Sequence, residues 1–97
     1  MALTNTQRKY LRGLTHDLDP VVMVADKGLS ENVRSEIEQA LTHHELIKVK
    51  VRAERDQRRA WIEEIAALTG AEVVHQIGQV ACYYRRHPKK PVLALPR

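Results

Sequence analysis

The chain has 97 residues, which is enough for one domain and too few for two. Apolar residues make up 43% of the chain, and a single core of this size needs neither disulfides nor metals. The lone cysteine, Cys82, cannot form an internal disulfide, which predicts a reducing, cytoplasmic location. We expect no membrane contact, because no apolar run approaches the about 20 residues of a spanning helix and the first residues lack a signal peptide.

The charge distribution favours a polyanionic partner. The net charge is +4, from 16 Lys and Arg against 12 Asp and Glu. Glu72 is the last acidic residue, and the basic residues that follow it are Arg85, Arg86, Lys89, Lys90 and Arg97. A C-terminal quarter of one sign is typical of nucleic-acid contact, and a solubilising tail is the alternative.

The first half of the chain predicts a helix, a strand and a second helix. Thr4 or Asn5 can cap a helix that runs to about Thr15, with an apolar side of Tyr10, Leu11, Leu14 and Leu18. Val21–Val24 is a short apolar run typical of a buried strand. Ser30 then caps a helix to about His44, whose apolar stripe is Leu29, Val33, Ile37, Ala40 and Leu41.

The second half predicts a strand, a helix and a hairpin. Residues 46–53 alternate apolar and basic side chains, which indicates a strand with one core face and one cationic face. A helix follows from about Asp56 to Thr69, with Trp61, Ile62, Ile65, Ala66 and Leu68 on its buried face. Gly78-Gln79 suits a type II′ turn between strands 71–77 and 80–85, and prolines make residues 86–97 irregular.

The predicted order is therefore α-β-α-β-α-β-β. Alternating strands and helices imply parallel neighbours, and the final hairpin adds an antiparallel pair. We expect an α/β protein of the two-layer α+β type, in which helices pack against a mixed four-stranded sheet. Residues 1–97 form one domain in this prediction, with a basic, proline-containing tail from about residue 86.

The turn Ala25-Asp26-Lys27-Gly28 is a candidate phosphate-binding site. It joins a predicted strand to a helix N-terminus, where free backbone N–H groups can bind phosphate. Gly28 would let a ligand approach the backbone, and Lys27 would add a mobile positive charge. A GXXG loop clamps the RNA backbone in this way in KH domains. An ordinary strand-to-helix turn is the alternative interpretation.

Further basic residues are candidates for a wider RNA surface. Lys48, Lys50 and Arg52 would stand about 7 Å apart along one strand face, and a solvated sheet face explains them slightly better than RNA contact does. Arg8, Lys9 and Arg12 fall on the polar side of the first helix. Another basic cluster consists of Arg55, Arg58 and Arg59. Glu54 and Asp56 are interleaved with these arginines and can pair with them.

Tyrosine stacking and catalysis receive less support. Tyr83 and Tyr84 are neighbours on a strand and face opposite sides, so one of them can be exposed for base stacking. Cys82 within a strand is typical of a small buried residue. No metal-ligand spacing joins it to the five histidines, which are His16, His43, His44, His75 and His87. We predict no catalytic residues, no metal, no cofactor and no small-molecule substrate.

Several segments resemble one known family. They are Leu11–His16, Pro20–Val22, Gly28–Ser30, Glu36–Leu41, His43–Lys50 and Leu93–Arg97. Together they resemble the YhbY family, the bacterial single-domain members of the CRM (chloroplast RNA splicing and ribosome maturation) class. The resemblance covers nearly the whole chain in one register. It implies the α-β-α-β-α-β-β fold, RNA binding through a GxxG loop, and association with precursors of the large ribosomal subunit.

One position departs from the family pattern. Ala25 stands where the family typically has the first glycine of GxxG, while Lys27 and Gly28 are retained. If that position needs positive φ, alanine costs about 1 kcal/mol or more. If it needs only room for a phosphate, a methyl group is tolerated.

The sequence thus predicts a non-catalytic RNA-binding protein that assists assembly of the large ribosomal subunit. The expected partners are large-subunit rRNA or its precursor particle, together with ribosomal proteins. The residues expected to contact RNA are Arg8, Lys9, Arg12, Ala25, Asp26, Lys27, Gly28, Lys48, Lys50, Arg52, Arg85 and Arg86. The alternative is a protein-interaction module whose apolar, proline-containing tail docks on a ribosome-associated partner.

Overall fold

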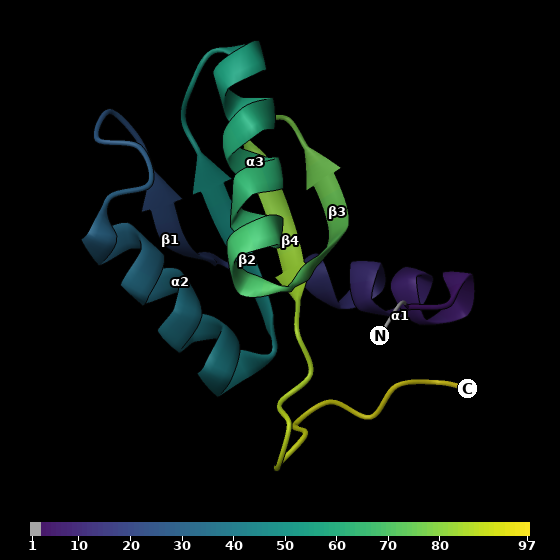
Figure 1. The fold of residues 1–97 in the computed structure, drawn as a ribbon. Coiled ribbons are helices and arrows are strands. Elements are labelled where there is room, and N and C mark those ends of the chain that lie inside the picture. The colour runs from purple at the N-terminus through teal and green to yellow at the C-terminus, as the bar shows by residue number, and fades with distance from the viewer. Residues whose placement is uncertain (1–2) are drawn as a thin grey trace.

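A computed structural model describes residues 3–97, so the first two residues of the predicted domain lie outside the described part. Figure 1 shows three helices and four strands in the predicted order. The elements are α1 (Asn5–Thr15), β1 (Pro20–Val24), α2 (Glu31–His44), β2 (Leu46–Val51), α3 (Arg55–Thr69), β3 (Glu72–Ile77) and β4 (Val80–Tyr84). The α/β class and the order of elements are confirmed.

Local capping sets most of these boundaries. The Thr4 hydroxyl accepts the Gln7 N–H, and the Gln7 side chain accepts the Thr4 N–H in return, which is a capping box for α1. Ser30 caps α2 in the predicted way. Gly70 ends α3 in the left-handed conformation, at φ 73°, and Gly78 turns the β3–β4 hairpin at φ 55°.

The four strands form one mixed sheet in the order β1-β2-β4-β3. β1 pairs with β2 in parallel, and β4 pairs with both β2 and β3 in antiparallel fashion. β2 ends at Val51, two residues before the predicted end at Ala53. The reason is that β1 also stops there, so the Arg52 N–H makes a final bond to the Val24 carbonyl at 2.8 Å and no partner strand remains beyond it.

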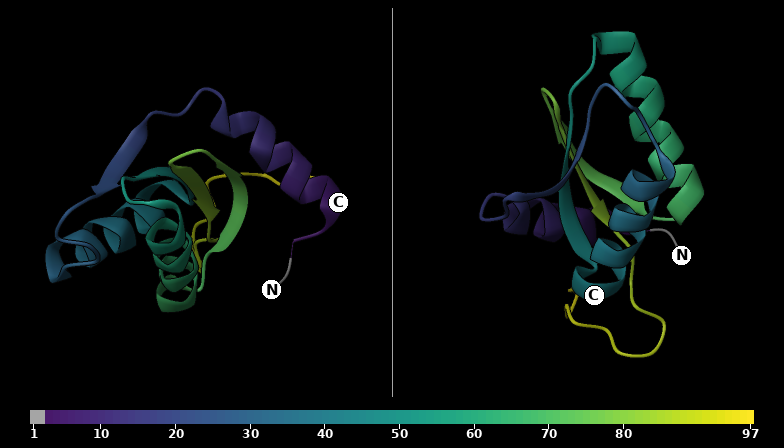
Figure 2. Two further views of the ribbon diagram at one scale, coloured as in Figure 1. Left: turned by 90° about the horizontal axis from the view of Figure 1, so that it is seen from above. Right: turned by 90° about the vertical axis from the view of Figure 1, so that its left-hand side faces the viewer.

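Helices cover both faces of the sheet. α2 and α3 pack on one face over the main core, which contains Val24, Ile37, Val49, Ile62, Ile65 and Tyr83. α1 lies on the opposite face, as the left-hand view of Figure 2 shows, over a smaller core of Leu11, Leu46, Val74, Cys82 and Tyr84. We call this opposite side the second face. The expectation that β1 is buried on both sides is wrong, because Val21 and Met23 point to the second face and are each 50% exposed.

Two apolar side chains assigned to buried helix faces are also exposed. Tyr10 in α1 is 43% exposed and Leu68 in α3 is 53% exposed. Each lies at the margin of its helix's apolar stripe, where the sheet no longer covers it. The three-and-four spacing therefore identified the stripe but not its edge.

The C-terminal segment, residues 85–97, contains no helix or strand, but it packs against the domain. Leu93 and Leu95 pack on the smaller core, and the Pro96 carbonyl accepts a bond from the Gln7 side chain at 3.0 Å. These two leucines, which the interaction-module alternative would dock on a partner, are partly buried against the protein's own core.

Glu45 holds this C-terminal segment in place. Its buried carboxylate accepts the backbone N–H groups of His87, Val92 and Leu93 at 2.6–2.7 Å. Burial alone would raise the pKa of Glu45, but the three N–H donors and the nearby His87 outweigh it and lower that pKa below its usual 4.5. One carboxylate thus fastens segments more than forty residues apart in the chain.

Candidate nucleic-acid interface

The turn from Ala25 to Gly28 joins β1 to α2 at one end of the sheet (Figure 1). The Gly28 N–H donates to the Ala25 carbonyl at 2.8 Å and closes the turn. This amide is therefore not the free outward donor that the sequence suggested. The N–H groups of Lys27 and Leu29 have no acceptor within residues 3–97, which leaves them available to a phosphate oxygen.

Gly28 is required by its backbone and by its neighbour on α3. Its φ is 63°, in the left-handed region, and a Cβ atom there would lie 2.9 Å from Cζ2 of Trp61. The close approach that we assigned to a ligand is thus made by the Trp61 indole. Sequence reasoning placed Trp61 in the helix core, and no local pattern indicated its contact with a turn 33 residues earlier.

Ala25 carries no comparable strain. Among residues 3–97, Glu45 is the one non-glycine residue with positive φ, so Ala25 lies outside the left-handed region. The missing first glycine raised two possibilities, a need for positive φ and a need for room. The energetic cost of positive φ does not arise at Ala25. The backbone at the first position of this turn is one that alanine adopts without strain.

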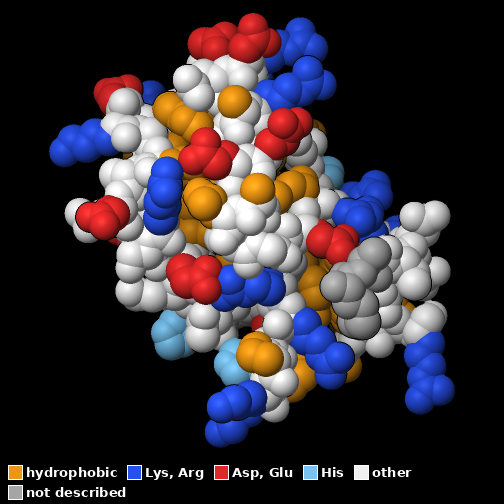
Figure 3. All heavy atoms as spheres, viewed as in Figure 1, with side chains coloured by type: hydrophobic (Ala, Val, Ile, Leu, Met, Phe, Trp, Pro, Cys, Tyr) orange, Lys and Arg blue, Asp and Glu red, His pale blue; other side chains and the backbone are white. Residues whose placement is uncertain are grey.

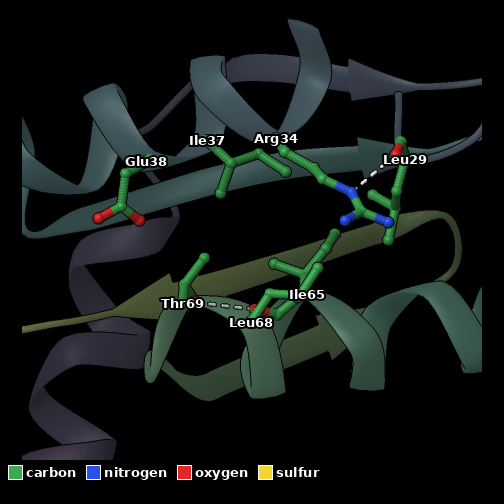
Figure 4. A pocket seen from close by; sticks show the side chains of 7 residues that line it. All are labelled: Leu29, Arg34, Ile37, Glu38, Ile65, Leu68 and Thr69. Atoms are coloured by element: carbon green, nitrogen blue, oxygen red, sulfur yellow. Dashed lines mark hydrogen bonds between the residues drawn. The ribbon is translucent and has the colours of Figure 1, made fainter. Parts of the chain in front are cut away.

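Arg34 fixes the chain as it leaves the turn. Its Nε donates to the Leu29 carbonyl at 2.8 Å, and its Nη2 pairs with Glu64 at 3.3 Å, which links α2 to α3. Figure 4 shows Arg34 at the rim of a groove between these helices. The groove is lined by Leu29, Arg34, Ile37, Glu38, Ile65, Leu68 and Thr69. Both of its charged residues are paired, Glu38 with Arg85, so the groove offers a polyanion no unpaired cation.

Basic residues lie at the same end of the sheet as the turn. Arg52 lies beside the end of β1 because its N–H bonds to the Val24 carbonyl. α3 begins three residues later and brings Arg55, Arg58 and Arg59 to the same end of the sheet. We call this region, which consists of Ala25–Gly28, Arg52, Arg55, Arg58 and Arg59, the loop end.

The interleaved acidic residues do not neutralise these arginines by direct pairing. The Glu54 carboxylate instead caps α3, where it accepts the N–H groups of Asp56 and Gln57. The ion pairs found within residues 3–97 join other residues, and Arg58 donates to the Ala53 carbonyl at 3.1 Å. The loop end therefore presents five basic side chains against the three carboxylates of Asp26, Glu54 and Asp56.

Lys48 and Lys50 lie on the second face and are half-buried. In the strand register Lys48 stands beside Cys82, and Lys50 stands beside Val80. Arg52 does not share this face as part of the strand, because β2 ends at Val51. The predicted row of three cations is therefore two lysines on the sheet and one arginine in the loop that follows.

The three basic residues of α1 do not act as a set. Arg8 pairs with Glu72 at 2.9 Å and donates to the Val73 carbonyl at 2.6 Å, so it attaches α1 to β3. Lys9 and Arg12 are exposed. Because α1 contacts β3 more than any other strand, these cations lie away from the loop end (Figure 1).

Arg85 and Arg86 lie at the opposite end of the sheet. The Arg85 N–H bonds to the Glu45 carbonyl, at the start of β2, whereas the loop end adjoins the finish of that strand. The Arg85 side chain pairs with Glu38 at 2.8 Å and donates to the Thr69 carbonyl at 3.0 Å. Arg86 lies beside it, so it cannot share one phosphate contact with Lys27.

Neither Tyr83 nor Tyr84 is exposed, so the hypothesis that one of them stacks on a base is wrong. Tyr83 faces the main core, where its hydroxyl donates to the Ile62 carbonyl at 2.9 Å, and Tyr84 is buried on the second face. Burial raises the pKa of both phenols. The sequence correctly predicted that Tyr83 and Tyr84 face opposite sides of the sheet. It did not predict that α1 and the C-terminal segment would cover the part of the second face where Tyr84 lies.

The described part of the chain offers no metal cluster and no reactive thiol. Residues 3–97 contain no group of three or more His, Cys, Asp or Glu side chains that could hold a metal ion. Burial raises the pKa of the Cys82 thiol, so this cysteine is not activated as a nucleophile. No helix in the described range has the length and apolarity to span a bilayer.

Comparisons with known proteins agree on one family. The probable RNA-binding protein PA4753 of Pseudomonas aeruginosa is 49% identical over 90 residues, which cover 92% of this chain and 86% of that protein. An RNA-binding protein of Haemophilus influenzae is 45% identical over 96 residues, covering 98% and 96% of the two chains.

A solved structure has the same fold. The solution structure of SAV1595 from Staphylococcus aureus, a candidate RNA-binding protein, superposes with a TM-score of 0.81. It is 33% identical and covers 98% of this chain and all of that one. The model of the CRS1 / YhbY (CRM) domain matches residues 3–85, and with these comparisons it shows that the chain belongs to the CRS1/YhbY (CRM) domain family.

Proposed function

We propose that this chain is a non-catalytic, cytoplasmic RNA-binding protein that binds large-subunit rRNA or its precursor and assists assembly of the large ribosomal subunit. RNA is the partner that the family and the names of its relatives support. The observation that carries the proposal is the loop end, where the Lys27 and Leu29 N–H groups have no acceptor within residues 3–97 and Arg52 lies beside the end of β1. The ribosomal target is supported by the sequence resemblance to YhbY proteins.

In this proposal the loop end contacts the RNA backbone. Phosphate oxygens accept the Lys27 and Leu29 N–H groups, and Lys27 and Arg52 neutralise the charge. Phosphate contacts fix position but carry little sequence information. The protein therefore selects its site through RNA shape and neighbouring ribosomal proteins.

A salt series with matched variants tests the loop end. Lys27→Glu is expected to weaken binding to a large-subunit rRNA fragment and to lower the log–log salt slope by about 0.7–0.9 for each phosphate that the variant no longer neutralises. Lys89→Glu makes the same charge change in the C-terminal segment, away from the turn, and serves as the control. Equally weakened binding in both variants, or an affinity that does not depend on salt, would contradict the proposal.

Crosslinking in cells tests the target. The protein is expected to crosslink to segments of the large-subunit rRNA precursor, and sequencing of the crosslinked RNA would identify them. Enrichment of unrelated RNAs only, with no large-subunit rRNA, would retain RNA binding and reject the role in subunit assembly.

A further inference from the structure

A row of side chains on the second face crosses the whole sheet beside the loop end. The strand registers pair Met23 with Lys50, Lys50 with Val80, and Val80 with Ile77. Paired residues share a face, so these four lie in line across β1, β2, β4 and β3. Met23 precedes Ala25 by two residues, which makes the row continuous with the turn. We call it the upper row.

The upper row is open at its two ends, Met23 and Ile77, while Val80 is half-buried against the smaller core. α1 packs over Leu46, Val74, Cys82 and Tyr84, which lie toward the other end of the strands. Met23 is left 50% exposed and Ile77 65% exposed. The two ends of the upper row, on the edge strands β1 and β3, are therefore accessible to a ligand that lies across the sheet.

The charges near the upper row match a polyanion. Lys50 stands in the row between Met23 and Val80, and Lys48 lies two residues away on the same face. Asp17 and Asp19 line a groove with Val21 and Lys48 on the same face, so Lys50 is the lysine of the row itself. The face formed by α2 and α3 is different, because acidic and basic groups alternate over it (Figure 3).

We propose that the upper row is a platform for single-stranded RNA that continues from the loop end, with Met23 and Ile77 against base faces and Lys50 on phosphate. This inference rests on the proposed function and adds a second contact surface to it. Apolar side chains such as Met and Ile can pack on unstacked bases, and Met adapts its shape to different partners. A second copy of the chain fits less well, because self-association of this face brings lysines together.

Exposed positions allow a test that leaves folding intact. The double variant Met23→Ser/Ile77→Ser keeps every charge, so the salt slope should not change. Its binding to a single-stranded rRNA fragment is expected to weaken about fivefold or more, because less apolar surface is buried against the bases. Lys50→Gln is expected to lower the slope by about 0.7. Val92→Ser, at an equally exposed apolar side chain in the C-terminal segment, is the control and should bind as the wild type does.

The outcomes separate this inference from the proposed function. If Lys27→Glu weakens binding but Met23→Ser/Ile77→Ser does not, the platform is rejected and the loop end stands. If the wild type binds no rRNA fragment, the proposed function fails with it. Dimers of the free protein in analytical ultracentrifugation that dissociate in Met23→Ser/Ile77→Ser would identify a second copy as the occupant and would also overturn the platform.

Discussion

At the residue scale, the contact between Gly28 and Trp61 determines the shape of the candidate RNA-binding turn. Gly28 has a left-handed backbone, and the Trp61 indole fills the space where a side chain at this position would lie. The turn is therefore built against α3 before any ligand arrives. A rigid turn loses less conformational entropy on binding than a flexible one.

This contact predicts a large cost for one methyl group. Gly28→Ala is expected to destabilise the protein, because an alanine in the left-handed region costs about 1–2 kcal/mol and overpacking against Trp61 adds about 1–3 kcal/mol. Urea denaturation measures the change. Gly13→Ala is the matched control, because its Cβ meets nothing within 4 Å and alanine favours the helix by about 0.5–1 kcal/mol. Equal stabilities of the two variants would contradict this account.

The sequence indicated that Gly28 matters, but for a different reason. A glycine at a strand-to-helix turn predicts an unusual backbone or a close approach, and both are present. The approaching group is Trp61, which lies 33 residues away, and no local pattern identifies a partner at that separation. The same limit applies to Arg34, whose bond to the Leu29 carbonyl depends on the angle between the turn and α2.

At the scale of elements, the C-terminal segment is held by a carboxylate and not by regular structure. Glu45 has a φ of 60°, which a non-glycine residue adopts at a cost, and its backbone and side chain both bind the chain beyond β4. The strain is offset by four hydrogen bonds to residues 85–93. Glu45 therefore holds residues 85–93 against the start of β2.

Acid is expected to release this segment. The folded pKa of Glu45 is below its usual 4.5, so its stabilising effect is complete above that pH and is lost as the pH falls through the lower, folded value. The amide shifts of Val92 and Leu93 in NMR spectra should report the release.

A neutral variant separates Glu45 from general acid unfolding. Glu45→Gln retains the side-chain shape but removes the charge, so the Val92 and Leu93 amides should be shifted already at pH 7 and should not change further in this acid range. If those amides titrate in the variant as they do in the wild type, another group holds the segment.

Local signals predicted the elements well and their partners less well. The structure confirms the helix starts predicted at Thr4 and Ser30, the helix end at Gly70 and the hairpin turn at Gly78. They could not show that α1 lies on the second face, because an apolar stripe reveals that a helix is buried but not which surface buries it. The end of β2 at Val51 depended on where β1 stops, which is also a tertiary property.

At the scale of the whole molecule, ion-paired side chains and unpaired basic side chains lie on different surfaces. The α2–α3 face holds acidic and basic groups together, where Arg34 of α2 pairs with Glu64 of α3 and Glu38 of α2 pairs with Arg85. The loop end and the lysines of the second face have no such pairing within residues 3–97. Of the predicted basic set, Arg8 and Arg85 belong to structural pairs, so we assign them to stability.

This separation predicts the footprint of RNA on the protein. In an NMR titration with an rRNA fragment, backbone amides of Lys27, Leu29 and Arg52 should shift first. Amides around the α2–α3 groove, such as those of Ile37 and Leu68, should stay in place. Shifts centred on that groove would show that the ligand follows the apolar surface between the helices and not the unpaired cations.

The packing of Trp61 on Gly28 has a practical consequence. Trp61 is the only tryptophan of the chain, and its ring lies directly beneath the turn proposed to receive RNA. Its intrinsic fluorescence is thus a built-in optical reporter for that turn. Binding can be followed in the unlabelled protein, at concentrations and speeds that suit stopped-flow measurement, with the signal arising at the proposed contact itself.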